Sequence, residues 1–144
     1  MTKYSGHSRN NMFMQALYRT TAREEVLAHA VVDCAYKVHT NLGPGLLEAV
    51  YECCFCCKLE KQAIPYARQV SVPLVYEGLK LEWGVRLDVL VENRIVCELK
   101  AVEALTPVFL AQILTQLKLV DLHLGFLINF NVARIKDGIR RVIR

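Results

Sequence analysis

At 144 residues, with 53% hydrophobic and 22% charged content, the chain is long enough for one domain with a substantial core and too short for two ordinary ones. No apolar run approaches the roughly 18 residues that cross a bilayer, and the polar start lacks the apolar stretch of a signal peptide, so we expect a soluble, cytoplasmic protein. The net charge is +4 at pH 7, with basic ends and an acidic centre. This distribution suits a metal site flanked by a phosphate-attracting surface, and solvated charge without a partner explains it equally well.

The six cysteines indicate a reducing, intracellular setting. Four of them lie in the run Cys53-Cys54-Phe55-Cys56-Cys57, where most pairs cannot adopt good disulfide geometry. Thiolates three and four residues apart on a helix can in principle hold zinc or an iron–sulfur cluster. Buried cysteines that pack as small hydrophobic residues are the simpler interpretation, which we adopt.

The first part of the chain is predicted to be an extension followed by two helices. Residues 1–20 show no sustained periodicity, so we expect a loosely ordered extension there and a single domain over residues 21–144. Thr21-Ala22-Arg23-Glu24 has the form of a capping box and opens the first helix. Gly43-Pro44-Gly45 ends that helix and begins the turn into the second.

Strand patterns and one further helix follow. Two runs rich in Val, Leu and Ile are separated by Glu92-Asn93-Arg94, which predicts a hairpin with a three-residue loop. Thr106-Pro107 supplies an N-cap and a proline at the first helical position. The predicted elements are helices at residues 21–41 and 46–62, strands at 70–76, 83–91 and 95–99, a helix at 106–120, a strand at 124–130 and a strand-like tail at 134–144. This order predicts an α/β fold in which helices flank a mixed central sheet.

The hairpin places acidic and basic side chains on one face. Successive side chains of a strand point to opposite faces, so Glu98 and Lys100 project from the same side. A three-residue loop makes paired residue numbers add up to 186, which places Asp88 opposite Glu98. Two opposed carboxylates in an apolar hairpin repel one another, and a divalent cation such as Mg²⁺ or Mn²⁺ offsets that repulsion. Lys100 can then orient or deprotonate an attacking water, or it can simply form an ion pair with Asp88 or Glu98.

These residues resemble the PD-(D/E)xK nuclease superfamily, with Asp88 followed after nine residues by Glu98-Leu99-Lys100. A second segment resembles the signature of the small bacterial GxxExxY family within it: Leu42-Gly43-Pro44-Gly45-Leu46-Leu47-Glu48-Ala49-Val50-Tyr51. Further matches are Val38-His39, Arg68-Gln69-Val70, Arg86-Leu87-Asp88, Ala101-Val102-Glu103, Ala111-Gln112 and Leu127-Ile128-Asn129-Phe130. The resemblance spans residues 25–143 and implies a restriction-endonuclease-like core.

The resemblance also implies the roles of individual residues. Asp88, Glu98 and a helical Glu48 would hold Mg²⁺, with Lys100 beside them and Gln112 contacting the attacking water or a phosphate. Without the resemblance, Glu48 would be read as a partner of the helix dipole and Gln112 as a surface group. The chain departs from the pattern at Gln116, where related sequences commonly have Tyr.

The implied substrate is nucleic acid, with DNA favoured over RNA. The expected nucleic-acid contacts are His39, Arg86, Arg140 and Arg141, although for His39 a surface role is the simpler interpretation. Two rival hypotheses remain: a catalytically silent nucleic-acid-binding or assembly module with a nuclease-like fold, and a cysteine-ligated metal or redox protein. A homodimer is compatible with the sequence, and no membrane partner is expected.

Overall fold

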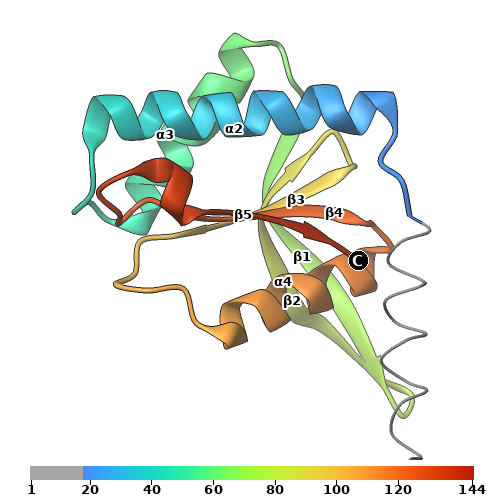
Figure 1. The fold of residues 1–144 in the computed structure, drawn as a ribbon. Coiled ribbons are helices and arrows are strands. Elements are labelled where there is room, and N and C mark those ends of the chain that lie inside the picture. Colours follow the sequence, from blue (N-terminus) through green and yellow to red (C-terminus); the bar gives the residue numbers. More distant parts are fainter. Residues whose placement is uncertain (1–17) are drawn as a thin grey trace, which may run out of the picture.

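The computed structural model describes residues 18–144 and has a five-stranded mixed sheet with helices on both faces (Figure 1). The elements are α2 (Ala22–Leu42), α3 (Glu48–Lys61), β1 (Tyr66–Tyr76), β2 (Leu79–Val91), β3 (Ile95–Lys100), α4 (Pro107–Val120), β4 (Leu124–Asn129), the 3₁₀ helix η1 (Ile135–Gly138) and β5 (Ile139–Ile143). The predicted α/β fold with a helix-flanked mixed sheet is confirmed.

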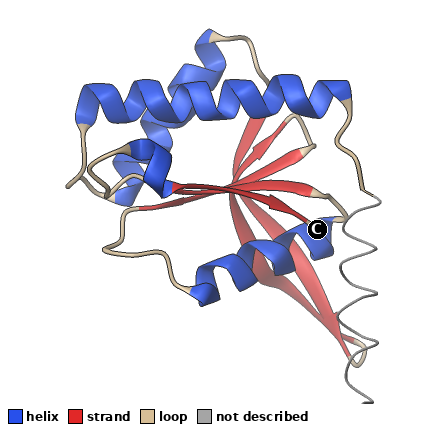
Figure 2. Ribbon diagram, in the orientation of Figure 1, coloured by secondary structure: helices blue, strands red, loops and turns tan. Residues whose placement is uncertain are grey.

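The order of strands in the sheet follows their order in the chain, from β1 to β5. The pairs β1–β2, β2–β3 and β4–β5 are antiparallel, and β3–β4 is parallel. A parallel connection needs a crossover, which α4 provides as it passes over one face. Both α2 and α3 cover the opposite face (Figure 2).

Two apolar cores fill the space on the two sides of the sheet. The larger one, here the α2/α3 core, joins α2 and α3 to side chains of all three central strands, among them Val89, Cys97, Leu99 and Phe126. The smaller one, the α4 core, consists of Val72, Leu87, Val96, Ile113, Leu117, Leu127 and Val142. Burial on both faces explains why β3 and β4 are almost continuously apolar in sequence.

The helix signals were reliable at their starts. The predicted capping box is present, because the Thr21 hydroxyl accepts from the Glu24 N–H and the Glu24 carboxylate accepts from the Thr21 N–H. At α4 the proline occupies the first turn as expected, but the Thr106 side chain makes no capping hydrogen bond. The predicted extension lies mostly outside the described residues. Within its last three residues, Tyr18 stacks on His123 and bonds to Glu24.

Strand lengths were predicted less well. Both β1 and β2 begin earlier than expected, and their hairpin extends beyond the rest of the sheet (Figure 1). The strand-like tail is divided into η1 and β5.

The interpretation of the cysteines was wrong in part. Cys56 is buried, but Cys53 and Cys57 are exposed and Cys54 is half-buried. All six cysteines are free thiols. Among the helices of residues 18–144, none is long and apolar enough to cross a membrane.

Candidate active site

The candidate site lies where β2 and β3 separate. Their ladder runs from Val91 opposite Ile95 to Val89 opposite Cys97, which is the register that the three-residue loop predicts. At the next pair, Asp88 and Glu98, hydrogen bonds between a carboxylate and a backbone amide take the place of bonds between two backbones. The Asp88 N–H donates to Glu98 Oε1 over 3.1 Å, and the Leu99 N–H donates to Asp88 Oδ2 over 2.9 Å. Each carboxylate is therefore held by a backbone amide of the other strand, and both are fixed in the fork.

A groove of about 540 Å³ opens at this fork, between the two strands and α4. Its lining residues are Gly84, Val85, Arg86, Asp88, Glu98, Lys100, Val108, Ala111, Gln112, Thr115 and Gln116. The predicted placement of Glu98 and Lys100 on one face is confirmed, since Val96 of the same strand packs into the α4 core while Cys97 and Leu99 pack into the α2/α3 core.

Lys100 forms the cationic wall of the groove. Its Nζ lies 3.8 Å from Glu98 Oε2 and 5.1 Å from the centroid of the Phe109 ring. Both contacts stabilise a positive charge at this position.

A buried asparagine fixes the chain just after Lys100. Asn129 Oδ1 accepts from the Val102 N–H and the Asn131 N–H, and its Nδ2 donates to the Val102 carbonyl. The Phe130 N–H donates to the Lys100 carbonyl. The end of β3, and with it the Lys100 backbone, is therefore tied to β4 by side-chain and main-chain bonds.

Both carboxyl groups are harder to ionise than usual. Burial, followed by the negative charge of Asp88, raises the pKa of Glu98 to about 7, while the Asp88 N–H, Lys100 and Gln116 act in the opposite direction. Burial also raises the pKa of Asp88, and the carboxylates of Glu52 and Glu48 add to this effect. The hydrogen bond from the Leu99 N–H and the charge of Lys100 oppose it. The pair thus concentrates negative charge that a cation would stabilise.

One comparison with known proteins identifies the family of this chain. The family model described as the PD-(D/E)XK nuclease superfamily matches residues 25–142. The chain belongs to the PD-(D/E)XK nuclease superfamily. No match was found among curated proteins or among solved structures. The Asp88, Glu98 and Lys100 arrangement of this PD-(D/E)XK protein therefore sits on a helix-flanked mixed sheet of the expected kind.

Nucleases of this superfamily generally use divalent metals such as Mg²⁺, and the residues present fit such an ion. Mg²⁺ takes one or two carboxylates from a protein and keeps several waters. Asp88 and Glu98 supply two, and Gln116 Oε1, also in the groove wall, is buried without a hydrogen-bond partner. Within residues 18–144, no group of three or more Asp, Glu, His or Cys side chains comes together as a metal site.

Glu48 is not part of the groove lining. It is the first residue of α3 and is exposed, although its charge still acts on Asp88. Glu52, one turn further along, is buried and acts on Asp88 more strongly than Glu48 does. The structure therefore brings together a pair of carboxylates, with two more carboxylates influencing the pair from α3.

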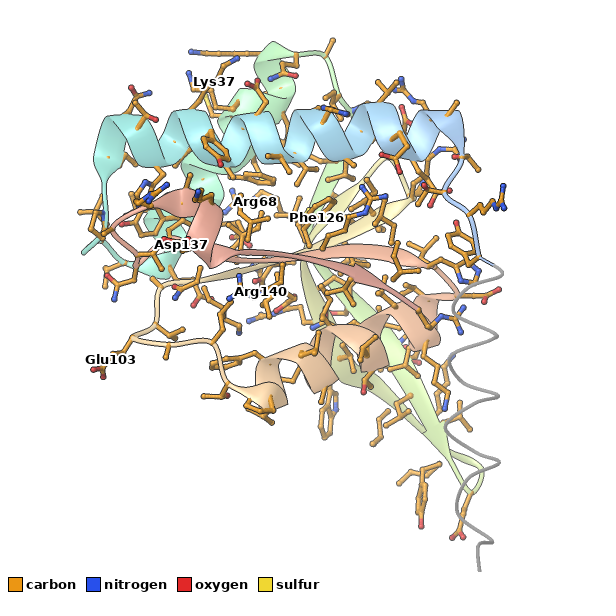
Figure 3. All side chains as sticks on the ribbon, viewed as in Figure 1. Lys37, Arg68, Glu103, Phe126, Asp137 and Arg140 are labelled. Atoms are coloured by element: carbon orange, nitrogen blue, oxygen red, sulfur yellow. The ribbon has the colours of Figure 1, made fainter. Side chains whose placement is uncertain are left out.

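Of the four residues predicted to contact nucleic acid, only Arg86 lies in the groove. Arg86 is exposed and lines the groove. His39 is buried, and its Nε2 lies 2.7 Å from the Val132 carbonyl oxygen, so it supports a loop. Arg140, on the α4 side of β5 (Figure 3), donates to the Asp137 and Ile139 carbonyls, and Arg141 pairs with Glu25 near α2.

Three polar residues near the site were not identified as site residues from sequence. Asn129 was noticed only as part of a matching segment, and Glu52 only as part of the helical stripe that contains Glu48. Gln69 has a φ of 51° in the middle of β1, which no local sequence signal indicates.

Proposed function

We propose that this protein is a Mg²⁺-dependent nuclease that hydrolyses phosphodiester bonds in nucleic acid, with DNA favoured, and that it belongs to the GxxExxY group. The observation that supports this best is the meeting of Asp88, Glu98 and Lys100 in one groove of a PD-(D/E)XK chain. We further propose a cytoplasmic location.

Asp88 and Glu98 would hold the ion, because their carboxylates are adjacent, partly desolvated and raised in pKa. A divalent cation supplies positive charge against the developing charge on a phosphate and makes a nearby water easier to deprotonate. Lys100 keeps its ammonium beside Glu98, where it can orient the attacking water and take part in moving its proton.

Arg86 and Gln112 would contact the substrate. Both are exposed in the groove lining, on opposite walls formed by β2 and α4. A guanidinium can bind a phosphate with two hydrogen bonds, and an amide can orient either a phosphate oxygen or the water. Glu48, exposed at the start of α3, is proposed as an additional carboxylate of the site that acts on Asp88 by its charge.

The test is cleavage of single-stranded, duplex and branched DNA and RNA by purified protein with Mg²⁺ or Mn²⁺. We expect Asp88→Asn and Lys100→Ala to reduce the cleavage rate by about 10²-fold or more, because each removes a group that acts on the reacting atoms. Glu103→Gln and Lys118→Ala are matched controls at exposed positions outside the groove and should cleave normally.

Wild-type protein that cuts no substrate, with variants that behave identically, would contradict the proposal. Tight, salt-sensitive binding of DNA without metal-dependent cleavage would instead support the silent binding module.

A further inference from the structure

An irregular step interrupts the β1–β2 ladder beside the site. Paired residues flank it at Arg68 opposite Val89 and at Val70 opposite Leu87, but Gln69 and Asp88 between them are not paired. The register is the same on both sides of this step. Gln69 adopts a left-handed conformation with φ 51°, which is uncommon for any residue other than glycine and unusual within a strand.

At this step the regular alternation of side chains between the two faces of the sheet is interrupted. On β2, Leu87 packs into the α4 core, Asp88 lines the groove on the same side, and Val89 packs into the α2/α3 core. Two consecutive side chains therefore point toward α4. A regular strand would alternate and would send either Leu87 or Asp88 to the α3 side. The step is what allows Leu87 to pack under α4 while Asp88 faces Glu98.

On β1, the consecutive side chains of Arg68 and Gln69 both point toward α3, where both bind Glu52. Gln69 Nε2 donates to Glu52 Oε1 over 2.6 Å, and Arg68 Nη2 donates to Glu52 Oε2 over 2.9 Å. The Arg68 guanidinium also contacts Cys53 of α3, so it lies against the exposed side of that helix. Glu52 is only 7% exposed and each of its two oxygens is bound by β1, whereas the donors Arg68 and Gln69 are themselves exposed.

We propose that Glu52 is a positioning residue: by holding Arg68 and Gln69 on the α3 side, it fixes the step in β1–β2 that turns Asp88 toward Glu98. The strained backbone at Gln69 persists only where its surroundings hold it in place, and Glu52 is the group that binds its side chain. The consequence for catalysis rests on the proposed nuclease function, whereas the consequence for the placement of Asp88 does not.

The placement can be measured without activity, through the Leu99 amide that donates to Asp88. In Glu52→Gln, an amide nitrogen replaces one acceptor oxygen and faces the donor which that oxygen had bound, either Gln69 Nε2 or Arg68 Nη2. We expect hydrogen exchange of the Leu99 amide in the full-length, metal-free protein, followed by NMR, to become about tenfold faster, while the amides of β4 keep their rates. Glu60→Gln, the same change at an exposed position of α3, should leave Leu99 unchanged.

A conformational rescue separates positioning from general destabilisation. Glycine adopts positive φ without strain, so Glu52→Gln combined with Gln69→Gly should restore slow exchange at Leu99, and the combination with Gln69→Ala should not. If Leu99 and the β4 amides exchange faster together, or if the Gln69→Gly and Gln69→Ala combinations behave alike, the inference is overturned.

The catalytic consequence is tested separately with Mg²⁺ and a cleavable substrate. We expect Glu52→Gln to lower kcat about tenfold with little change in KM, and Gln69→Gly to recover part of that loss. A wild-type protein that does not cleave would refute the proposed function and leave the Leu99 result intact. An active wild type with unchanged Leu99 exchange in Glu52→Gln would refute the role of Glu52 alone.

Discussion

At the scale of single residues, the two desolvated carboxylates of the groove destabilise the fold that holds them. Glu98 is 4% exposed and lies against Asp88, with Lys100 as the nearest cation at 3.8 Å. Its backbone hydrogen bond from Asp88 orients the carboxylate but does not remove the effect of burial, because the pKa is still raised. Two adjacent desolvated carboxylates therefore destabilise the folded protein while no cation neutralises them.

Glu98 should therefore make the metal-free protein less stable as pH rises. Its pKa is about 7 in the folded state against an ordinary value of 4.5, so the folded state keeps a proton that the unfolded state has released. The protonated Glu98 side chain therefore adds to the free energy of unfolding below pH 4.5, and this added stability is lost as pH rises through 7. We expect Glu98→Gln to be more stable than wild type by about 1–3 kcal/mol at about pH 8 and to show no such gain near pH 4.5, as measured by urea denaturation in EDTA.

Glutamine keeps an acceptor for the Asp88 N–H, so the comparison isolates the charge. Glu103→Gln, at an exposed position of the loop after β3 (Figure 3), is the control and should not alter the pH dependence. A stability difference between wild type and Glu98→Gln that stays constant across this pH range would refute the explanation. Added Mg²⁺ should reduce the difference, since the ion offsets the same charge.

At the scale of elements, β3 is useful to the site only if its end is held in place. Lys100 is the last residue of β3, and the chain leaves the sheet immediately after it. Asn129, at the end of the neighbouring parallel strand, binds both backbone polar groups of Val102. The amide side chain thus acts as a bridge between the end of β4 and the segment that follows β3.

Asn129→Ala should loosen this connection and destabilise the protein. It removes the acceptor of the half-buried Val102 and Asn131 N–H groups and leaves the Val102 carbonyl only the long bond from the Asn131 side chain, so we expect a loss of about 1–3 kcal/mol in the free energy of unfolding. Asn131→Ala is the matched control, because Asn131 contributes only one long side-chain bond of 3.4 Å to the Val102 carbonyl. Chemical denaturation of both variants measures the difference, and equal losses would show that Asn129 has no special role.

The elements that were predicted well are those whose signals are local. The capping box at Thr21 involves residues three apart, and the β2–β3 register follows from a three-residue loop, so Asp88 and Glu98 could be matched from sequence. The step at Gln69 could not be predicted, because the Glu52 carboxylate that binds it lies 17 residues away on another element. For the same reason, the sequence suggested a trio with Glu48 where the groove contains a pair.

At the scale of the whole molecule, positive charge accompanies the two carboxylates of the groove. The chain carries a net charge of +4, and Arg86 and Lys100 line the same groove as the two carboxylates. Many of the other arginines are already engaged: Arg23 with Glu92, Arg68 with Glu52, Arg141 with Glu25 and Arg144 with Asp121. Within the part of the chain that the structure describes, Arg86 has neither an ion pair nor a side-chain hydrogen bond, so its guanidinium is available to a phosphate.

Binding of nucleic acid should therefore depend on Arg86 more than on Arg141. In EDTA, where cleavage is prevented, we expect Arg86→Ala to weaken binding of labelled DNA and to reduce the slope of log K against log salt concentration by about one, as measured by fluorescence anisotropy. Arg141→Ala removes the same charge, but its guanidinium already neutralises Glu25, so its loss should change the slope little. Equal slopes for the two variants would mean that overall charge attracts the nucleic acid. In that case the groove would not be where its backbone is held, and the acidic fork would need another route to its substrate.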